Sequence, residues 1–114
     1  MPFINSKVNV SISDAQEKEL KSKLAKAIEI IPGKSENWLM LGFEDNCKLY
    51  FQGDNARKIA FVEVKIFGSS DKAVLSKVTA EICDVFKAVL DIEPSNVYVK
   101  YEEVDNWGWN GSNF

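Results

Sequence analysis

The sequence contains no histidine, so a side chain or terminus that moves protons must be a carboxylate, a lysine or an amine. The candidate we favour is at the start of the chain, where Met1 is followed by Pro2. Removal of Met1 would turn the proline nitrogen from an amide into a basic secondary amine. An α-amino group has a pKa of about 7.7 to 8.0, which burial or a nearby cation lowers. Pro2 is therefore a candidate general base, although Met-Pro alone is a weak signal.

The two cysteines, Cys47 and Cys83, have no histidine to pair with. This composition excludes Ser-His and Cys-His catalysis and leaves no zinc site. We therefore expect no metal and no other cofactor. We interpret both thiols as small buried groups of a protein in a reducing compartment.

Length and composition indicate one globular domain over residues 1–114, with 46% hydrophobic and 27% charged residues. The net charge is -3 and the basic residues are scattered, which argues against a nucleic-acid partner. Neither a classical export signal nor a membrane-spanning run is present, so we expect no membrane partner. The expected location is cytoplasmic, with secretion by a non-classical route as the alternative.

The elements that must position Pro2 begin with a short β-prone run that closes at Val8–Val10. Ser13 and Gln16 form a capping-box pattern and predict the start of a helix, which Pro32-Gly33 would end. The apolar run Trp38–Phe43 then predicts a strand covered on both sides. The apolar face of the helix comprises Leu20, Leu24, Ala27, Ile28 and Ile31.

The second half of the chain repeats this order after a turn signal at Gln52–Asn55. Strands are predicted at Lys58–Phe67 and Val97–Glu102, with a helix between them that Pro94 would stop. Two such units predict an α/β fold with two tandem β-α-β units, a four-stranded mixed sheet and two helices on one face. The apolar stripe of the second helix comprises Leu75, Val78, Ile82, Val85, Phe86 and Val89.

The sheet face without helices combines charged and aromatic side chains. If the apolar positions of 58–67 face the helices, Phe61, Glu63 and Lys65 must face away, because side chains alternate along a strand. Lys100 and Glu102 alternate in the same way in the last strand. This face is either solvated in a monomer or lines a central channel in a ring of subunits, with its charges in compensating pairs.

The whole chain resembles the macrophage migration inhibitory factor family of the tautomerase superfamily. The most specific part is the tail Trp107-Gly-Trp-Asn-Gly-Ser-Asn-Phe114, which is similar to the family's Gly-Trp-Asn ending. The family's fold, a trimer of four-stranded sheets around a channel, agrees with the predicted order of elements. The other matching segments are Met1–Ile4, Gly33-Lys34, Ile66–Gly68 and Pro94–Val99.

This resemblance implies a role for each matching position. Pro2 corresponds to the catalytic proline and Lys34 to the lysine that binds the acidic end of the substrate. Ile66 and Phe67 lie where the family contributes a backbone amide, and the neighbouring subunit would supply Tyr98. The simpler interpretations are a solvated lysine, an ordinary strand tyrosine and C-terminal packing of the tail. The implied aromatic rim comprises Trp38, Trp107, Trp109 and Phe114.

Two positions depart from the family's pattern. Ile59-Ala60-Phe61-Val62 replaces a Cys-x-x-Cys pair, so we expect no thiol-disulfide activity tied to that pair. Lys100 replaces an asparagine beside the pocket and adds a positive charge, which would either strengthen binding of an anionic substrate or shift its preference.

The resemblance implies a homotrimeric keto-enol tautomerase that acts on a small aromatic α-keto acid such as phenylpyruvate, with Pro2 as the base. One alternative is a secreted, cytokine-like signalling or host-modulating protein with a vestigial pocket, and another is a structural trimer. Nothing in the sequence identifies a receptor.

Overall fold

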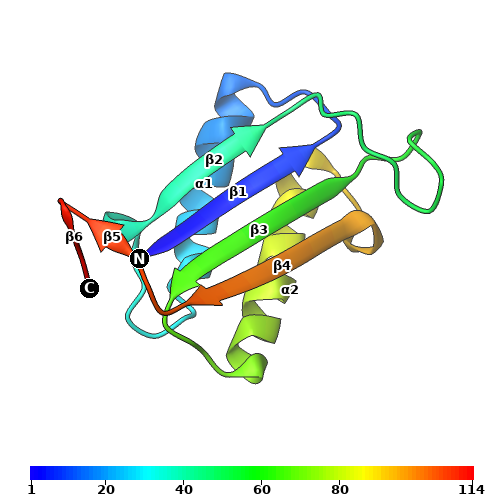
Figure 1. Cartoon of the computed structure of the whole chain (residues 1–114). Helices are drawn as coiled ribbons and strands as arrows, with labels where there is room; N and C mark the ends of the chain where they lie inside the picture. Colours follow the sequence, from blue (N-terminus) through cyan, green and yellow to red (C-terminus); the bar gives the residue numbers. More distant parts are fainter.

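Two strand-helix-strand units follow each other along the chain, and a small hairpin follows the second (Figure 1). The computed structural model describes residues 1–114. The first unit comprises β1 (Pro2–Val8), α1 (Asp14–Ile28), the 3₁₀ turn η1 (Glu36–Trp38) and β2 (Met40–Glu44). The remaining elements are β3 (Ala60–Phe67), α2 (Lys72–Leu90), η2 (Pro94–Asn96), β4 (Val97–Val104), β5 (Gly108–Trp109) and β6 (Ser112–Asn113).

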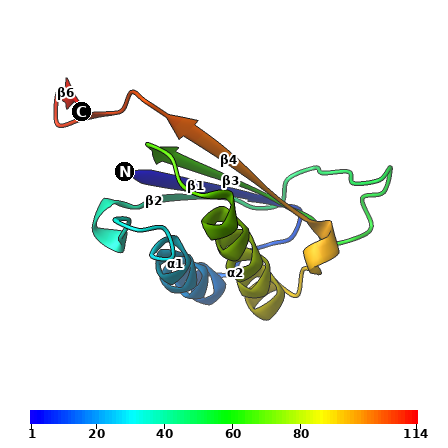
Figure 2. The same ribbon diagram turned by 90° about the horizontal axis from the view of Figure 1, so that it is seen from below.

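The four long strands form one mixed sheet in the order β2-β1-β3-β4. Within each unit the two strands are parallel, whereas β1 and β3 are antiparallel. Both helices lie against the same face of the sheet, and the other face is bare (Figure 2). The predicted α/β arrangement is therefore confirmed.

Local sequence signals explain where α1 begins. The Ser13 side chain accepts a hydrogen bond from the Gln16 backbone, and the Gln16 side chain accepts one from the Ser13 backbone. This capping box satisfies two N–H groups that a helix start leaves unpaired. The predicted core face is confirmed, since Leu20, Leu24, Ala27, Ile28 and Ile31 are all buried.

Both helices end before the proline that was expected to stop them. α1 ends at Ile28, four residues before Pro32. α2 ends at Leu90 because Asp91 adopts a left-handed conformation, with φ of 54°, and its N–H closes the last turn onto Lys87 and Phe86. Pro94 instead begins the 3₁₀ turn before β4.

The prediction of a fully covered strand over Trp38–Phe43 was wrong. The strand begins at Met40, and Trp38 belongs to η1. β2 is an edge strand of the sheet, and Met40 is 67% exposed. Leu41 and Phe43 face the helices and are partly buried against the core, so the run is covered on one side only.

The other strands alternate as predicted. Along β3, Ala60, Val62, Val64 and Ile66 are buried, and the residues between them are half-buried on the bare face. On that face Lys100 forms an ion pair of 3.0 Å with Glu102. The two cysteines are free thiols, but both are half-buried rather than buried. Neither helix has the length and apolar composition needed to cross a membrane.

One polar group in the core leads to a stability prediction. Ser6 is completely buried on the helix-facing side of β1, and its hydroxyl has no hydrogen-bond partner in the chain. Because an unpaired buried hydroxyl costs about 1 to 3 kcal/mol, Ser6→Ala should raise the free energy of unfolding by about 1 kcal/mol. Urea denaturation measures this change. Ser11→Ala is the control, because the Ser11 hydroxyl donates to Asn46 Oδ1 at 2.8 Å and its loss should not stabilise. A destabilised Ser6→Ala would contradict the prediction.

Candidate active site

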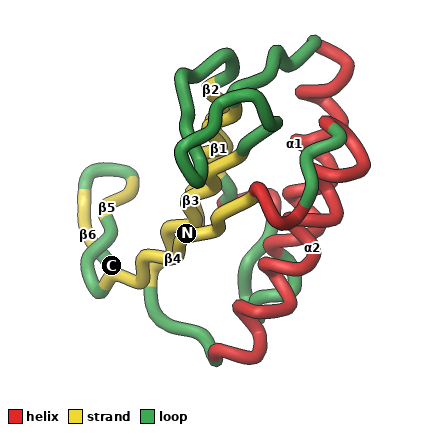
Figure 3. The backbone as a smooth tube through the Cα atoms, turned by 90° about the vertical axis from the view of Figure 1, so that its right-hand side faces the viewer, coloured by secondary structure: helices red, strands yellow, loops and turns green.

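A cavity of about 400 Å³ lies at the end of the sheet where the chain begins. The start of β1 lines one side, η1 and the start of β2 line another, and Trp107, Gly108 and Trp109 line the rest. The N-terminus and the hairpin β5–β6 lie at the same end of the sheet (Figures 1 and 3). The cavity walls are mostly apolar, as is usual for a small-molecule pocket. The lining residues are Met1, Pro2, Phe3, Asn37, Trp38, Leu39, Met40, Trp107, Gly108 and Trp109.

Pro2 is the first residue of β1 and pairs with Ile66 of β3. Both side chains are buried on the helix side of the sheet. Immediately before Pro2, the Met1 carbonyl accepts a hydrogen bond of 3.2 Å from the Phe67 N–H. With Met1 in place, the Phe67 N–H is therefore already hydrogen-bonded, and the Pro2 nitrogen is an amide.

Lys34 reaches the same point from the loop after α1. A turn places Lys34 there. Gly33 has a φ of +81°, a conformation that glycine adopts readily, and the Lys34 N–H donates to the Ile31 carbonyl at 3.1 Å. The Lys34 ammonium donates to the Phe67 carbonyl at 3.1 Å. Burial, and then the adjacent Lys34 charge, lower the pKa of the Met1 amine. A cation and a backbone donor thus converge on the chain terminus.

Aromatic rings from distant parts of the sequence form one wall. Trp38 meets Trp109 edge to face at 5.1 Å, and Trp109 stacks on Phe114 at 6.4 Å. Phe114 also contacts the Phe67 ring at 5.7 Å, and its N–H donates to the Trp107 carbonyl. Trp38, Trp109 and Phe114 are about half exposed in the single chain. Trp38 and Trp109 line the cavity and give it an apolar wall suited to an aromatic ligand.

A model of the family described as macrophage migration inhibitory factor (MIF) matches residues 1–114. The chain belongs to the macrophage migration inhibitory factor family.

Solved structures agree with this assignment. MIF2 of Leishmania major is 30% identical, with a TM-score of 0.92 over 100% of this chain and 97% of that chain. A homologue of Prochlorococcus marinus is 31% identical, with a TM-score of 0.81 over 98% of each chain. A fused 4-OT protein, solved as a symmetric trimer, is 14% identical with a TM-score of 0.84 over 96% and 93%, and shows the fold alone. Comparison with curated protein sequences finds no match. This chain thus has the fold of its macrophage migration inhibitory factor relatives.

Of the predicted site residues, Pro2, Trp38, Trp107 and Trp109 line the cavity. Lys34, Ile66, Phe67 and Phe114 adjoin these lining residues or Met1, whereas Tyr98 and Lys100 lie farther away. Tyr98 pairs with Phe61, five residues along β3 from Ile66, which is about 17 Å of strand at about 3.3 Å per residue. Lys100 pairs with Glu63 and lies three residues from Ile66. Neither residue lines the cavity around the Pro2 of its own chain.

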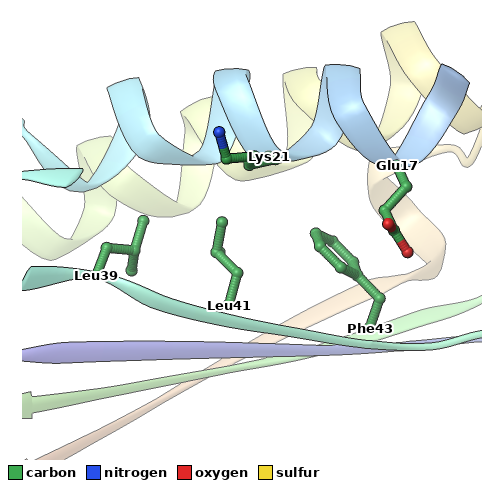
Figure 4. Close-up of a pocket in the computed structure, with 5 residues that line it drawn as sticks. All are labelled: Glu17, Lys21, Leu39, Leu41 and Phe43. Carbon is green, nitrogen blue, oxygen red and sulfur yellow. The ribbon is translucent and has the colours of Figure 1, made fainter. Parts of the chain in front are cut away.

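A larger hollow of about 460 Å³ lies between α1 and β2 (Figure 4). Leu39, Leu41 and Phe43 point up from the strand toward Lys21 and Glu17 of the helix. It contains none of the residues that the MIF resemblance marks. The candidate site therefore remains at Pro2.

The sequence interpretation did not place six of the lining residues in the pocket, namely Met1, Phe3, Asn37, Leu39, Met40 and Gly108. Phe3 and Met40 face each other across the parallel β1–β2 pair. For three of the six, the position in the sequence was a signal. Phe3 follows Pro2, Asn37 precedes Trp38, and Met40 lies two residues after Trp38. Such neighbours matter because a pocket wall includes short runs of chain rather than single residues.

Proposed function

We propose that this MIF-family chain is a cofactor-independent keto-enol tautomerase of small aromatic α-keto acids, with phenylpyruvate as the assay substrate. The observation that carries the proposal is the convergence of Pro2, the Lys34 ammonium and the Phe67 N–H beside an aromatic wall. Removal of Met1 would have two effects. It would create the Pro2 amine, and it would free the Phe67 N–H, which donates a hydrogen bond to the Met1 carbonyl.

In the proposed reaction the neutral Pro2 nitrogen removes a proton from the carbon beside the keto group. The electron pair moves onto the carbonyl oxygen and forms an enolate, which backbone N–H groups and Lys34 stabilise. Protonated Pro2 then returns the proton to oxygen, giving the enol, or to carbon, giving the ketone. Lys34 also pairs with the substrate carboxylate, while the aromatic wall takes the ring.

We propose further that the site is completed in a homotrimer, where a neighbouring subunit places Tyr98 and Lys100 at the pocket. The strand register supports this, because Tyr98 lies at the far end of the sheet from the Pro2 of its own chain. The half-exposed Trp38, Trp109 and Tyr98 supply apolar surface for such contacts. The distant structural likeness to a trimeric 4-OT protein is consistent with it.

Ketonisation of enol-phenylpyruvate, followed by ultraviolet absorbance, tests the function. Intact mass must first show that Met1 is absent. Wild-type protein should accelerate the reaction, and Pro2→Gly should lose at least about tenfold, since glycine offers a more mobile primary amine. A wild-type protein without turnover would contradict the proposal and would favour the signalling or structural alternatives.

Lys34 gives a further prediction. Lys34→Ala should raise KM for phenylpyruvate about 10- to 100-fold, because a hydrogen bond to a charged group contributes about 1.5 to 3 kcal/mol. Removing the cation should also raise the pKa of the Pro2 amine and move the pH–rate limb upward. Initial rates from pH 5 to 9 measure both effects. Lys26→Ala, which removes an exposed charge from the last turn of α1, should change neither. An unchanged KM in Lys34→Ala would assign the carboxylate to another group.

A further inference from the structure

Arg57 joins two segments at the end of the sheet opposite Pro2. Its Nη2 donates to the Phe51 carbonyl and to Gln52 Oε1, both at 3.1 Å, and its Nη1 donates to Asn96 Oδ1 at 3.4 Å. Its Nε lies 3.3 Å from a carboxylate oxygen of Asp54. One half-buried guanidinium thus ties the long β2–β3 loop to the turn before β4.

These contacts lead directly to Tyr98. The Arg57 guanidinium carbon lies 5.6 Å above the centre of the Phe51 ring, and Phe51 meets the Tyr98 ring edge to face at 5.0 Å. Asn96 is nearly buried and stands two residues before Tyr98 in the chain. Arg57 therefore holds both the ring that packs on Tyr98 and the backbone that leads into it.

The support for Tyr98 is itself fixed. Asn9, just after β1, accepts from the Ile59 N–H at 2.7 Å and donates to the Arg57 carbonyl at 2.7 Å. Phe51 and Asp54 exchange backbone hydrogen bonds of 2.9 and 3.0 Å around a tight turn. The loop is thus closed on itself at Phe51 and Asp54 and is anchored to the end of β1 at Arg57 and Ile59.

We infer that Arg57 is a positioning residue for catalysis in the neighbouring subunit, acting through Phe51 on the orientation of Tyr98. The inference rests on the proposed function. Arg57 does not reach the pocket around Pro2; it sets where the Tyr98 hydroxyl points when that residue enters a neighbour's pocket. The planar guanidinium fork spreads its donors over two nitrogens that reach Phe51, Gln52 and Asn96, and the single ammonium nitrogen of lysine cannot reproduce that spread.

Arg57→Lys and Tyr98→Phe, singly and combined, test the inference. Arg57→Lys should lower kcat/KM about tenfold, since small misplacements of a site group carry losses of up to about 100-fold. In the Tyr98→Phe background the same change should have little effect, because the hydroxyl that it positions is gone. The pH–rate limb of Pro2 should not move. Asp54→Asn keeps all the other Arg57 contacts and is the matched control.

Nuclear Overhauser effects between the Phe51 and Tyr98 rings give a readout besides turnover, and they should weaken in Arg57→Lys but not in Asp54→Asn. A wild-type protein without turnover would overturn the proposed function and, with it, this inference. If wild-type protein is active, wild-type rates in Arg57→Lys would overturn the inference alone. So would an equal loss in the Tyr98→Phe background, a shifted pH limb or unchanged ring contacts.

Discussion

A protein that keeps one residue in front of Pro2 is expected to retain less than about 1% of the phenylpyruvate turnover of the processed protein. The reason is that the proline nitrogen is then an amide and cannot take a proton, while a positioned general base contributes about 10²- to 10⁴-fold. In the chain that keeps Met1, moreover, the Phe67 N–H donates its hydrogen bond to the Met1 carbonyl and is not free to stabilise the proposed enolate. Initial rates of two preparations of known intact mass measure the difference.

The processed protein should show a characteristic pH dependence. A base works only when it is deprotonated, so kcat/KM should rise with pH through one ionisation and then level off. Burial, and then the Lys34 charge, already lower the pKa of the Met1 amine at this site. The same causes should hold the pKa of the Pro2 amine below the ordinary α-amino range. A flat profile from pH 5 to 8, or full activity with a residue in front of Pro2, would show that another group is the base.

The sequence predicts the fold well where a local pattern and the tertiary structure agree. The Ser13 cap and the apolar stripe of α1 are local signals, and the alternation of β3 follows directly from having helices on one face only. The edge position of β2 could not be predicted in this way. The sequence pattern of an apolar strand does not tell whether a second layer of the same chain or another subunit covers its outer face. In the single chain Met40 is exposed on that face.

The candidate site is less predictable because it joins distant segments. No local pattern brings Trp109 against Trp38, 71 positions earlier, or the Lys34 ammonium to the Phe67 carbonyl. The family resemblance marked these residues, and the structure supplied their distances. Arg57 was missed, because a single arginine in a polar loop carries no sequence signal for its contacts with Phe51 and Asn96.

Mixing two impaired variants is expected to restore activity. Pro2→Gly has only the more mobile glycine amine in place of the proline base, and Tyr98→Phe lacks the hydroxyl that a neighbouring subunit would supply. Because Tyr98 lies about 17 Å along the sheet from the Pro2 of its own chain, each pocket must draw these two groups from different subunits. After the variants are unfolded together at equal concentration and refolded, random trimers should contain pockets with both groups intact.

An intact pocket needs Pro2 from a Tyr98→Phe subunit and Tyr98 from a Pro2→Gly neighbour. Each of these subunits is present with a chance of about one half, so the expected recovery is about one quarter of the wild-type rate. Each variant refolded alone is the control, and light scattering should report about three times the 12.8 kDa chain in all samples. Mixing without joint refolding should give no gain while the subunits do not exchange. A rate equal to the average of the two variants would mean that each chain builds its site alone, which the strand register of β3 and β4 does not allow for Tyr98.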